Sequence, residues 1–251
     1  RYRQSMKIEK FVTGIISTNC YLVINEETKQ TVVIDPAACP SYLMGHIKSE
    51  GLQVEAILLT HGHFDHIMGI GDLRKEFPVP VYAHEGDRET LLDPSLNLSI
   101  SYTDGYTFDG ATYVRDGQTL ELAGASFQVI HTPGHSMGSV CFLDHKERLL
   151  VTGDTVNDCL LLNFPPHTST VAQYHESIQK LWAREGEYDG LCQGHDTLTI
   201  ADKSFITDYL TATEIILSGQ ASPQEIDDGI HKGLGIRCGK VRLYYELNSI
   251  R

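Results

Sequence analysis

The sequence predicts an α/β fold of four layers, in which two mixed β-sheets are flanked by helices. Short runs of β-branched and other apolar residues recur in both halves of the chain, each bounded by polar or glycine-containing turns. Segments with the apolar spacing of amphipathic helices lie between these runs and after them. Because no repeat, low-complexity tract or linker divides the chain, we expect one domain over residues 6–251 that closes with C-terminal helices.

The first half of the chain is expected to begin with two neighbouring strands and to continue as strand–helix units. Residues 20–24 and 31–34 have strand composition, and the polar segment between them suits a hairpin connection. Residues 41–50 have a helical pattern that ends at Gly51. The other predicted elements are strands over 54–60 and 79–83 and a helix over 67–76.

The second half repeats this arrangement after a long loop. Residues 93–116 contain many polar and aromatic residues without a clear period, which predicts a loop of the kind that often covers a functional site. Apolar runs and helical patterns then alternate again. The predicted strands cover 127–130, 140–143, 149–151 and 191–193, and the predicted helices cover 171–185 and 204–218.

Composition and charge limit the kinds of protein that this chain can be. Its 251 residues are 41% apolar and 21% charged, as in ordinary globular proteins, and no apolar run approaches the roughly 18 residues of a membrane span. The net charge of −13 argues against a nucleic-acid surface, so we expect a small-molecule substrate, with a homodimer as a possible assembly. Six cysteines without a C-x-x-C pair favour the cytoplasm, where thiols stay reduced. Residues 1–5 resemble the remnant of a cleaved affinity tag.

A dense group of metal-binding residue types follows the apolar run 56–59. His61, His63, Asp65 and His66 lie within six positions, a composition that core packing does not require. Imidazole and carboxylate are ligands that zinc accepts, and imidazole also suits iron. Because side chains alternate along an extended segment, His61 and His63 are expected to point the same way. The sequence therefore predicts a metal site at a strand end, where open α/β folds place their ligand sites.

Four further strands are predicted to end in a turn that holds a residue able to bind or orient a metal. A glycine or a proline lies beside each of these residues, which permits a tight turn and a close approach. The residues are Asp35, His135, Asp154 and His195. Any one of these short patterns occurs by chance, whereas the ordered set is specific.

In order along the chain, the patterns H-x-H-x-D-H, T-P-G-H, G-D-T and G-H resemble the metallo-β-lactamase superfamily over about residues 8–200. The resemblance implies an αβ/βα sandwich with a dinuclear metal site that holds two zinc ions, with iron or manganese as alternatives. It also implies that Asp35 orients a ligand histidine and that Asp65 is catalytic, aiming the attacking hydroxide. The implied ligands are His61, His63 and His135 for the first ion, Asp65, His66 and His195 for the second, and Asp154 as the bridge.

The same resemblance implies a hydrolase in which a hydroxide that bridges the two metals attacks an ester, thioester or lactone carbonyl. Asp154 stands where β-lactamases of the commonest zinc class carry a cysteine, so the chain is more similar to the glyoxalase-II-like hydrolases of hydroxyacylglutathione. Asn157 stands where the lactonases carry a tyrosine, and it is predicted to contact substrate together with Phe164.

The implied metal arrangement leaves two other activities open. One is hydrolysis of a phosphodiester, in which the two metals flank an in-line displacement. The other is iron-dependent redox chemistry, although the flavin-linked iron members of the superfamily carry a glutamate where this chain has His63.

Overall fold

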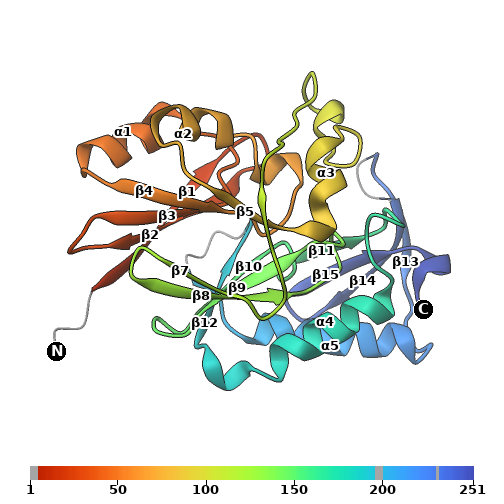
Figure 1. The fold of residues 1–251 in the computed structure, drawn as a ribbon. Coiled ribbons are helices and arrows are strands. Elements are labelled where there is room, and N and C mark those ends of the chain that lie inside the picture. Colours follow the sequence, from red (N-terminus) through yellow and green to blue (C-terminus); the bar gives the residue numbers. More distant parts are fainter. Residues whose placement is uncertain (1–4, 196–199, 230–231) are drawn as a thin grey trace.

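The N-terminal half of the chain forms a six-stranded mixed sheet (Figure 1). In the computed structural model, which describes residues 5–195, 200–229 and 232–251, strands β1 to β3 pair antiparallel and strands β3 to β6 pair parallel. Parallel neighbours need a crossover, and helices α1 and α2 supply two of them on one face of the sheet. The elements are β1 (Met6–Thr13), β2 (Thr18–Asn25), β3 (Gln30–Ile34), α1 (Ser41–Ser49), β4 (Gln53–Leu58), α2 (Ile70–Glu76), β5 (Val81–His84) and β6 (Thr112–Val114).

Strand β2 is apolar along most of its length because both faces of the sheet are covered. Leu22 and Ile24 pack in one cluster with Leu43 of α1, on the helical side of the sheet. Tyr21 and Val23 alternate with them and pack in a second cluster on the opposite side. A strand that is buried on both faces reads as a continuous hydrophobic run, and the predicted strand at this position is confirmed.

The second half of the chain forms a five-stranded sheet that packs face to face with the first. Leu58 of the first sheet shares a buried cluster with Phe127 and Phe142 of the second, so one hydrophobic core lies between the two sheets. Helix α4 connects β10 to β12, which pair in parallel, and a capping box between Thr170 and Gln173 begins the helix. The elements are β7 (Thr119–Leu122), β8 (Ala125–His131), β9 (Val140–Asp144), β10 (Leu149–Gly153), α4 (Val171–Trp182) and β12 (Gly190–Gln193).

A third, four-stranded sheet accompanies the two main sheets of the predicted sandwich. The C-terminus was predicted to be helical, but three strands follow α5 and pair with β11 in the order β11-β15-β14-β13. Leu243 and Tyr245 face α5 and the core, whereas Arg242 and Tyr244 alternate with them on the other face. Glycines within β14 obscure this alternation in the sequence. The elements are β11 (Cys159–Leu162), α5 (Ser204–Leu217), β13 (Gln224–Asp227), β14 (Lys232–Cys238) and β15 (Val241–Tyr245).

The segment predicted as one long loop, residues 93–116, is partly ordered. Its end forms β6 at the edge of the first sheet. Its start is held by Asn97, whose side chain donates to the Tyr106 carbonyl at 2.8 Å and accepts from the Ser99 amide at 2.9 Å. The remaining short helices are α3 (Arg88–Leu92) and the single 3-10 turns Phe64–His66, Glu85–Asp87, Ser99–Ser101, Glu185–Glu187 and Leu247–Ser249.

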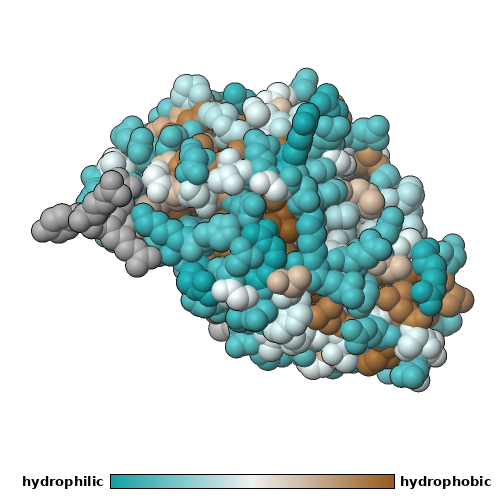
Figure 2. Space-filling view, turned by 60° about the horizontal axis from the view of Figure 1, so that its bottom comes forward, coloured by the Kyte–Doolittle hydropathy of each residue, from teal (hydrophilic) through white to brown (hydrophobic). Residues whose placement is uncertain are grey.

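The surface seen in Figure 2 is largely hydrophilic, with apolar groups gathered mainly at its lower right. Among the described residues, none of the helices combines the length and hydropathy needed to span a lipid bilayer. The prediction for residues 1–5 falls outside the described residues except for Ser5, which bonds Glu26.

Candidate metal centre

The candidate site lies where strands from both main sheets end. In the first sheet, Asp35 directly follows β3 and His61 lies just beyond β4. In the second sheet, Asp154 directly follows β10, while His135 and His195 lie in the turns after β8 and β12. Side chains from distant parts of the sequence therefore meet at one edge of the sandwich, as expected for ligand sites of α/β folds.

The segment after β4 turns earlier than predicted. The strand ends at Leu58, a 3-10 turn covers Phe64–His66, and α2 begins at Ile70 rather than at residue 67. Gly69 explains the sharp path, because its amide donates to the Pro36 carbonyl and a Cβ there would lie 2.6 Å from the Ala38 carbonyl carbon. This close approach of two backbones places the histidines of the turn against the end of β3.

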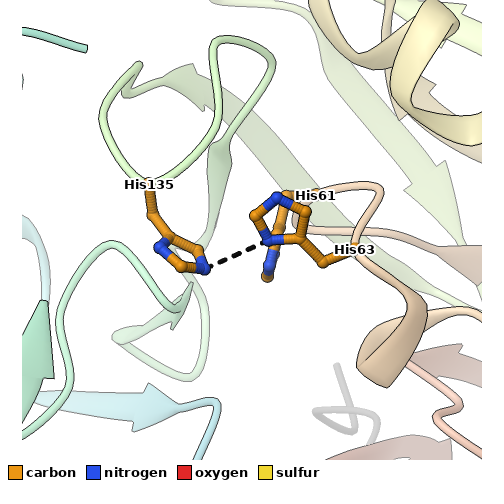
Figure 3. Close-up of side chains that lie close together, drawn as sticks. All are labelled: His61, His63 and His135. Carbon is orange, nitrogen blue, oxygen red and sulfur yellow. Dashed lines mark hydrogen bonds between the residues drawn. The ribbon is translucent and has the colours of Figure 1, made fainter. Parts of the chain in front are cut away.

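Three buried histidines form the first group of metal-binding side chains (Figure 3). His61 and His63 come from the turn after β4, and His135 reaches them from the turn after β8. The Nδ1 atom of His63 lies 3.1 Å from the Nε2 atom of His135, and the His61 ring lies edge-on to both. One nitrogen from each ring thus points to a common centre, which is the arrangement that three ligands of a tetrahedral cation require.

Four side chains form the second group, namely Asp65, His66, Asp154 and His195. The Nε2 atom of His195 lies 3.1 Å from Oδ2 of Asp65 and 3.2 Å from both carboxylate oxygens of Asp154. Asp154 also contacts the first group, since its Oδ2 lies 3.4 Å from Nε2 of His135 and 3.6 Å from Nε2 of His61. This one carboxylate therefore joins the two groups.

The hydrogen bonds of three histidines, His61, His66 and His135, leave one ring nitrogen of each to face the groups. The Nδ1 atoms of His61, His66 and His135 lie 2.8–3.1 Å from the Thr60 hydroxyl, the Asp35 carboxylate and the Leu161 carbonyl, respectively. The opposite Nε2 atoms point inward. That of His61 is buried and has no hydrogen-bond partner within the described part of the chain, although burying a polar nitrogen without a partner costs free energy. A bound cation would satisfy it, so the residues fit a metal.

The two groups differ in how burial and neighbouring charges shift the pKa values of their histidines. Burial and the neighbouring His135 lower the pKa of His63 to about 3, and burial also lowers the pKa of His61, so these two imidazoles are neutral, the form that binds metals. Burial would also lower the pKa of His195, but the carboxylates of Asp154 and Asp65 outweigh it and raise the pKa to about 10. Protons and divalent cations therefore compete for the second group.

Asp35 connects β3 to the metal-binding turn. Its carboxylate accepts from the Thr60 amide at 2.8 Å and the Thr60 hydroxyl at 2.6 Å, and its Oδ2 lies 2.8 Å from Nδ1 of His66. The backbone of Asp35 has a φ of 54°, a left-handed conformation that is unfavourable for a residue with a Cβ. The three contacts hold this strained residue in place, and they fix the tautomer of His66.

Asn157, which was predicted to contact substrate, makes its hydrogen bonds to members of the second group. Its side chain is only 3% exposed, and its amide donates to Oδ1 of Asp154 at 3.0 Å. Its side-chain oxygen accepts from the amides of Gly194 and His195 at 3.0 and 3.3 Å. Asn157 therefore positions two members of the second group. Phe164 is 38% exposed and follows β11, whose Leu161 contacts His135.

Asp87 is a buried residue beside the site that sequence reasoning missed. It is 1% exposed, and its carboxylate accepts from the Gly62 amide at 2.8 Å, the Gly138 amide at 2.8 Å and the Ser136 hydroxyl at 2.7 Å. It thus ties the turn that holds His61 to the turn that holds His135. Burial raises its pKa, and these three hydrogen bonds lower it in part. No motif marks Asp87, because its partners lie 25 to 51 positions away.

The comparison with known proteins supports the assignment of a metal site. The model of the metallo-beta-lactamase superfamily matches residues 13–195. The chain is 30% identical to the hydroxyacylglutathione hydrolase GloC of Haemophilus influenzae over 155 residues, which cover 60% of this chain and 72% of that protein.

Two solved structures show the same fold at higher coverage. BLEG-1, a B3 metallo-beta-lactamase, is 33% identical with a TM-score of 0.70, over 77% of this chain and 94% of that one. TTHA1623 in a di-iron-bound form is 27% identical with a TM-score of 0.65, over 79% of this chain and 96% of that one. The chain belongs to the metallo-beta-lactamase superfamily, and it is a metal-dependent hydrolase with two adjoining groups of metal-binding side chains.

Proposed function

We propose that this chain is a dinuclear zinc hydrolase that cleaves an ester or thioester carbonyl of a small molecule. His61, His63 and His135 would hold one ion, and Asp65, His66 and His195 the other. The observation that carries the proposal is the position of Asp154, whose carboxylate contacts histidines of both groups. Two-metal sites place their ions about 3.5–4 Å apart, and a carboxylate that reaches both groups suits this spacing.

Each part of the site has a role in this chemistry. Two bound dications would supply Lewis acidity toward the carbonyl oxygen and would lower the pKa of water from ~15.7 to about 7. The carboxylate of Asp65 is partly exposed and lies 3.1 Å from His195, so it can accept the proton of the attacking water and hold its lone pair toward the substrate. Asp35, Asn157 and the Leu161 carbonyl keep the histidines and Asp154 oriented.

A small cavity beside Asp65 supports an acyl substrate. Its volume is about 140 Å³, and Ile15, Ala37, Ala38 and Met68 contribute apolar walls next to the carboxylate. A space of this size suits a short acyl group, with the scissile carbonyl at the metal groups. The similarity to GloC, which is called a hydroxyacylglutathione hydrolase, points in the same direction and favours a thioester.

A substrate panel tests this proposal against its rivals. Protein loaded with zinc, manganese or iron is assayed on an acyl glutathione thioester, an aryl ester, an aryl phosphodiester and a chromogenic β-lactam. The β-lactam is included because BLEG-1 is a metallo-beta-lactamase. We expect the thioester to be cleaved with the highest kcat/KM, by at least ~100-fold over the phosphodiester. A phosphodiester preference, or redox turnover that requires iron, would overturn the proposal.

Removal of single ligands provides a second test. We expect His61→Ala and Asp65→Ala to lose bound metal and turnover together, because each removes a ligand from one of the two groups. Turnover that survives with unchanged metal content would show that the two groups are not the catalytic centre.

A further inference from the structure

A second, larger cavity lies on the C-terminal sheet. Its volume is about 540 Å³, and Ile215, Ile226 and Tyr244 provide apolar walls. A Cβ on Gly235 would lie 2.5 Å from a side-chain atom of Ile226 and 2.9 Å from the Tyr244 ring, so the glycine leaves room for both side chains over β14. The C-terminal strands lie on the right in Figure 1, the side on which Figure 2 shows apolar groups gathered at the surface. The cavity is therefore an apolar depression at the molecular surface.

Two arginines line one end of this cavity. Arg237 and Arg242 are directly opposite in the antiparallel pairing of β14 and β15, where like charges destabilise a sheet. Asp158 lies 3.9 Å from Arg242, whereas no carboxylate in the described part of the chain pairs with Arg237. Arg237 is therefore a cation at an apolar cavity that its own chain does not neutralise, although the net charge of the chain is −13.

An exposed apolar side chain and an acid lie toward the other end of the same strands. Leu247 is 73% exposed, more than any other large apolar side chain among the described residues. Glu246 precedes it, and a Cβ on Gly233 would lie 3.4 Å from Oε1 of Glu246, which places the carboxylate over β14. With a rise of about 3.3 Å per residue, Gly233 and Arg237 are roughly 13 Å apart along this strand. Within residues 200–229 and 232–251, no cation pairs with Glu246.

The two ends belong to one surface. Ile226, which lines the cavity, also lines a second depression together with Leu234, Glu246 and Leu247. A basic end at Arg237, an apolar middle at Ile226 and an acidic end at Glu246 therefore follow one another along the sheet. A surface with this order is complementary to itself after a two-fold rotation, because the basic end of each copy then meets the acidic end of the other.

We propose that two copies of this chain form a two-fold dimer through this surface. Leu247 of each copy enters the cavity of the other, and Glu246 of each copy pairs with Arg237 of the other. The contact removes Leu247 from water, and the carboxylate offsets the repulsion between the two facing arginines. A second copy fits better than an unrelated partner, because one surface supplies the apolar side chain, the cavity that receives it and both charges. The inference does not depend on the proposed hydrolase activity, since none of these side chains belongs to the metal groups.

Sedimentation velocity of the metal-loaded protein tests whether the dimer forms. The measurement covers about 1 to 100 μM, because dimerisation depends on concentration by mass action. We expect the mass to rise with concentration toward twice the 28.0 kDa of one chain. Protein that stays monomeric over the whole range would overturn the inference. Species that grow beyond the dimer would also overturn it, because they indicate a head-to-tail contact that does not close.

Charge reversal tests which residues meet. Arg237→Glu and Glu246→Arg should each raise the dissociation constant of the dimer by about 100-fold or more, because like charges then face each other twice in a two-fold interface. In an equimolar mixture of the two variants every acid meets an arginine again, so we expect a heterodimer with nearly wild-type affinity. Misfolding of either variant cannot produce this rescue. A mixture that remains monomeric, while each variant alone is monomeric and folded, would contradict the proposed pairing.

A second pair of variants tests the apolar contact. Leu247→Lys places a cation against the arginines of the other copy and should abolish the dimer. Leu92→Lys is the matched control, since Leu92 is an apolar side chain of α3 that is 44% exposed, and this variant should keep the wild-type dissociation constant. If the dimer of Leu247→Lys is as stable as that of wild-type protein, the copies associate through another surface and the inference is wrong.

Discussion

Replacement of Asn157 by alanine should weaken metal binding at the second group, although it removes none of the metal-binding side chains. The side chain makes three hydrogen bonds at 3.0–3.3 Å, one to the carboxylate of Asp154 and two from the amides of Gly194 and His195. Alanine makes none of them. Asp154 then loses the donor that fixes its rotamer, and the turn that carries His195 loses its anchor.

The expected loss of metal-binding free energy can be worked out from these hydrogen bonds. A hydrogen bond to a charged group contributes about 1.5–3 kcal/mol, and a buried amide without a partner costs about 1–3 kcal/mol. Part of this loss destabilises the fold whether or not metal is bound. The remainder acts on the orientation of Asp154 and His195, and loss of such supporting residues typically weakens metal binding 10–100-fold. That range corresponds to about 1.4–2.7 kcal/mol of binding free energy.

Asn25 provides a matched control, because its hydrogen bonds have the same pattern in another part of the fold. It is fully buried, its amide donates to the Ala123 carbonyl at 3.1 Å, and its side-chain oxygen accepts from the amides of Glu27 and Thr28 at 3.1 and 3.3 Å. Asn25→Ala should therefore cost a comparable free energy of unfolding but leave metal affinity unchanged.

Zinc affinity is measured by competition with a chromophoric chelator, using metal-free protein and both variants. The expected result is a 10–100-fold weaker second binding step in Asn157→Ala alone. If both variants lose equal stability and both retain wild-type zinc affinity, then Asn157 only packs the turn, and the role assigned to it is wrong.

Three further predictions concern the same centre. Zinc at a free concentration of ~100 Kd should stabilise the fold by about 2.7 kcal/mol and raise Tm by roughly 5–10 °C in calorimetry, an effect that His61→Ala should reduce. Asp35→Asn keeps the shape but removes the charge that Nδ1 of His66 faces, so it should weaken zinc binding at the second group about tenfold in the same competition assay. Asp87→Ala and Asp144→Ala both remove a buried carboxylate that accepts backbone amides, and each should cost roughly 2–4 kcal/mol in denaturant unfolding. Only Asp87→Ala should also lower zinc affinity, and equal zinc affinity in the two variants would contradict its role.

The elements that were predicted correctly are those that a local sequence pattern encodes. Strand β2 and helix α1 follow from continuous apolar runs and helical spacing, and their observed bounds lie within three residues of those predicted. The metal-binding residue types were recognisable because several lie close together or at strand ends. The start of α2 was predicted three residues too early, because the path of the chain at Gly69 depends on contact with Ala38, far away in the sequence.

The residues that escaped prediction act through contacts between distant segments. Asp87 joins two turns that only the folded sandwich brings together, and nothing in its local sequence distinguishes it from a surface acid. Asn157 was predicted to contact substrate, and its hydrogen bonds to the amides of Gly194 and His195 could not be foreseen, because they depend on the parallel pairing of β10 with β12. Supporting residues of this kind depend on which distant segments the fold brings into contact, so the sequence pattern alone does not identify them.

The metal-binding side chains are concentrated in one part of this chain. Both groups lie within residues 13–195, the part that the superfamily model matches, whereas strands β13 to β15 lie beyond it and were not predicted from the sequence. Strand β15 nevertheless pairs with β11, whose Leu161 carbonyl lies 3.1 Å from Nδ1 of His135. The C-terminal sheet therefore supports the metal centre through β11, although no metal-binding motif encodes this sheet.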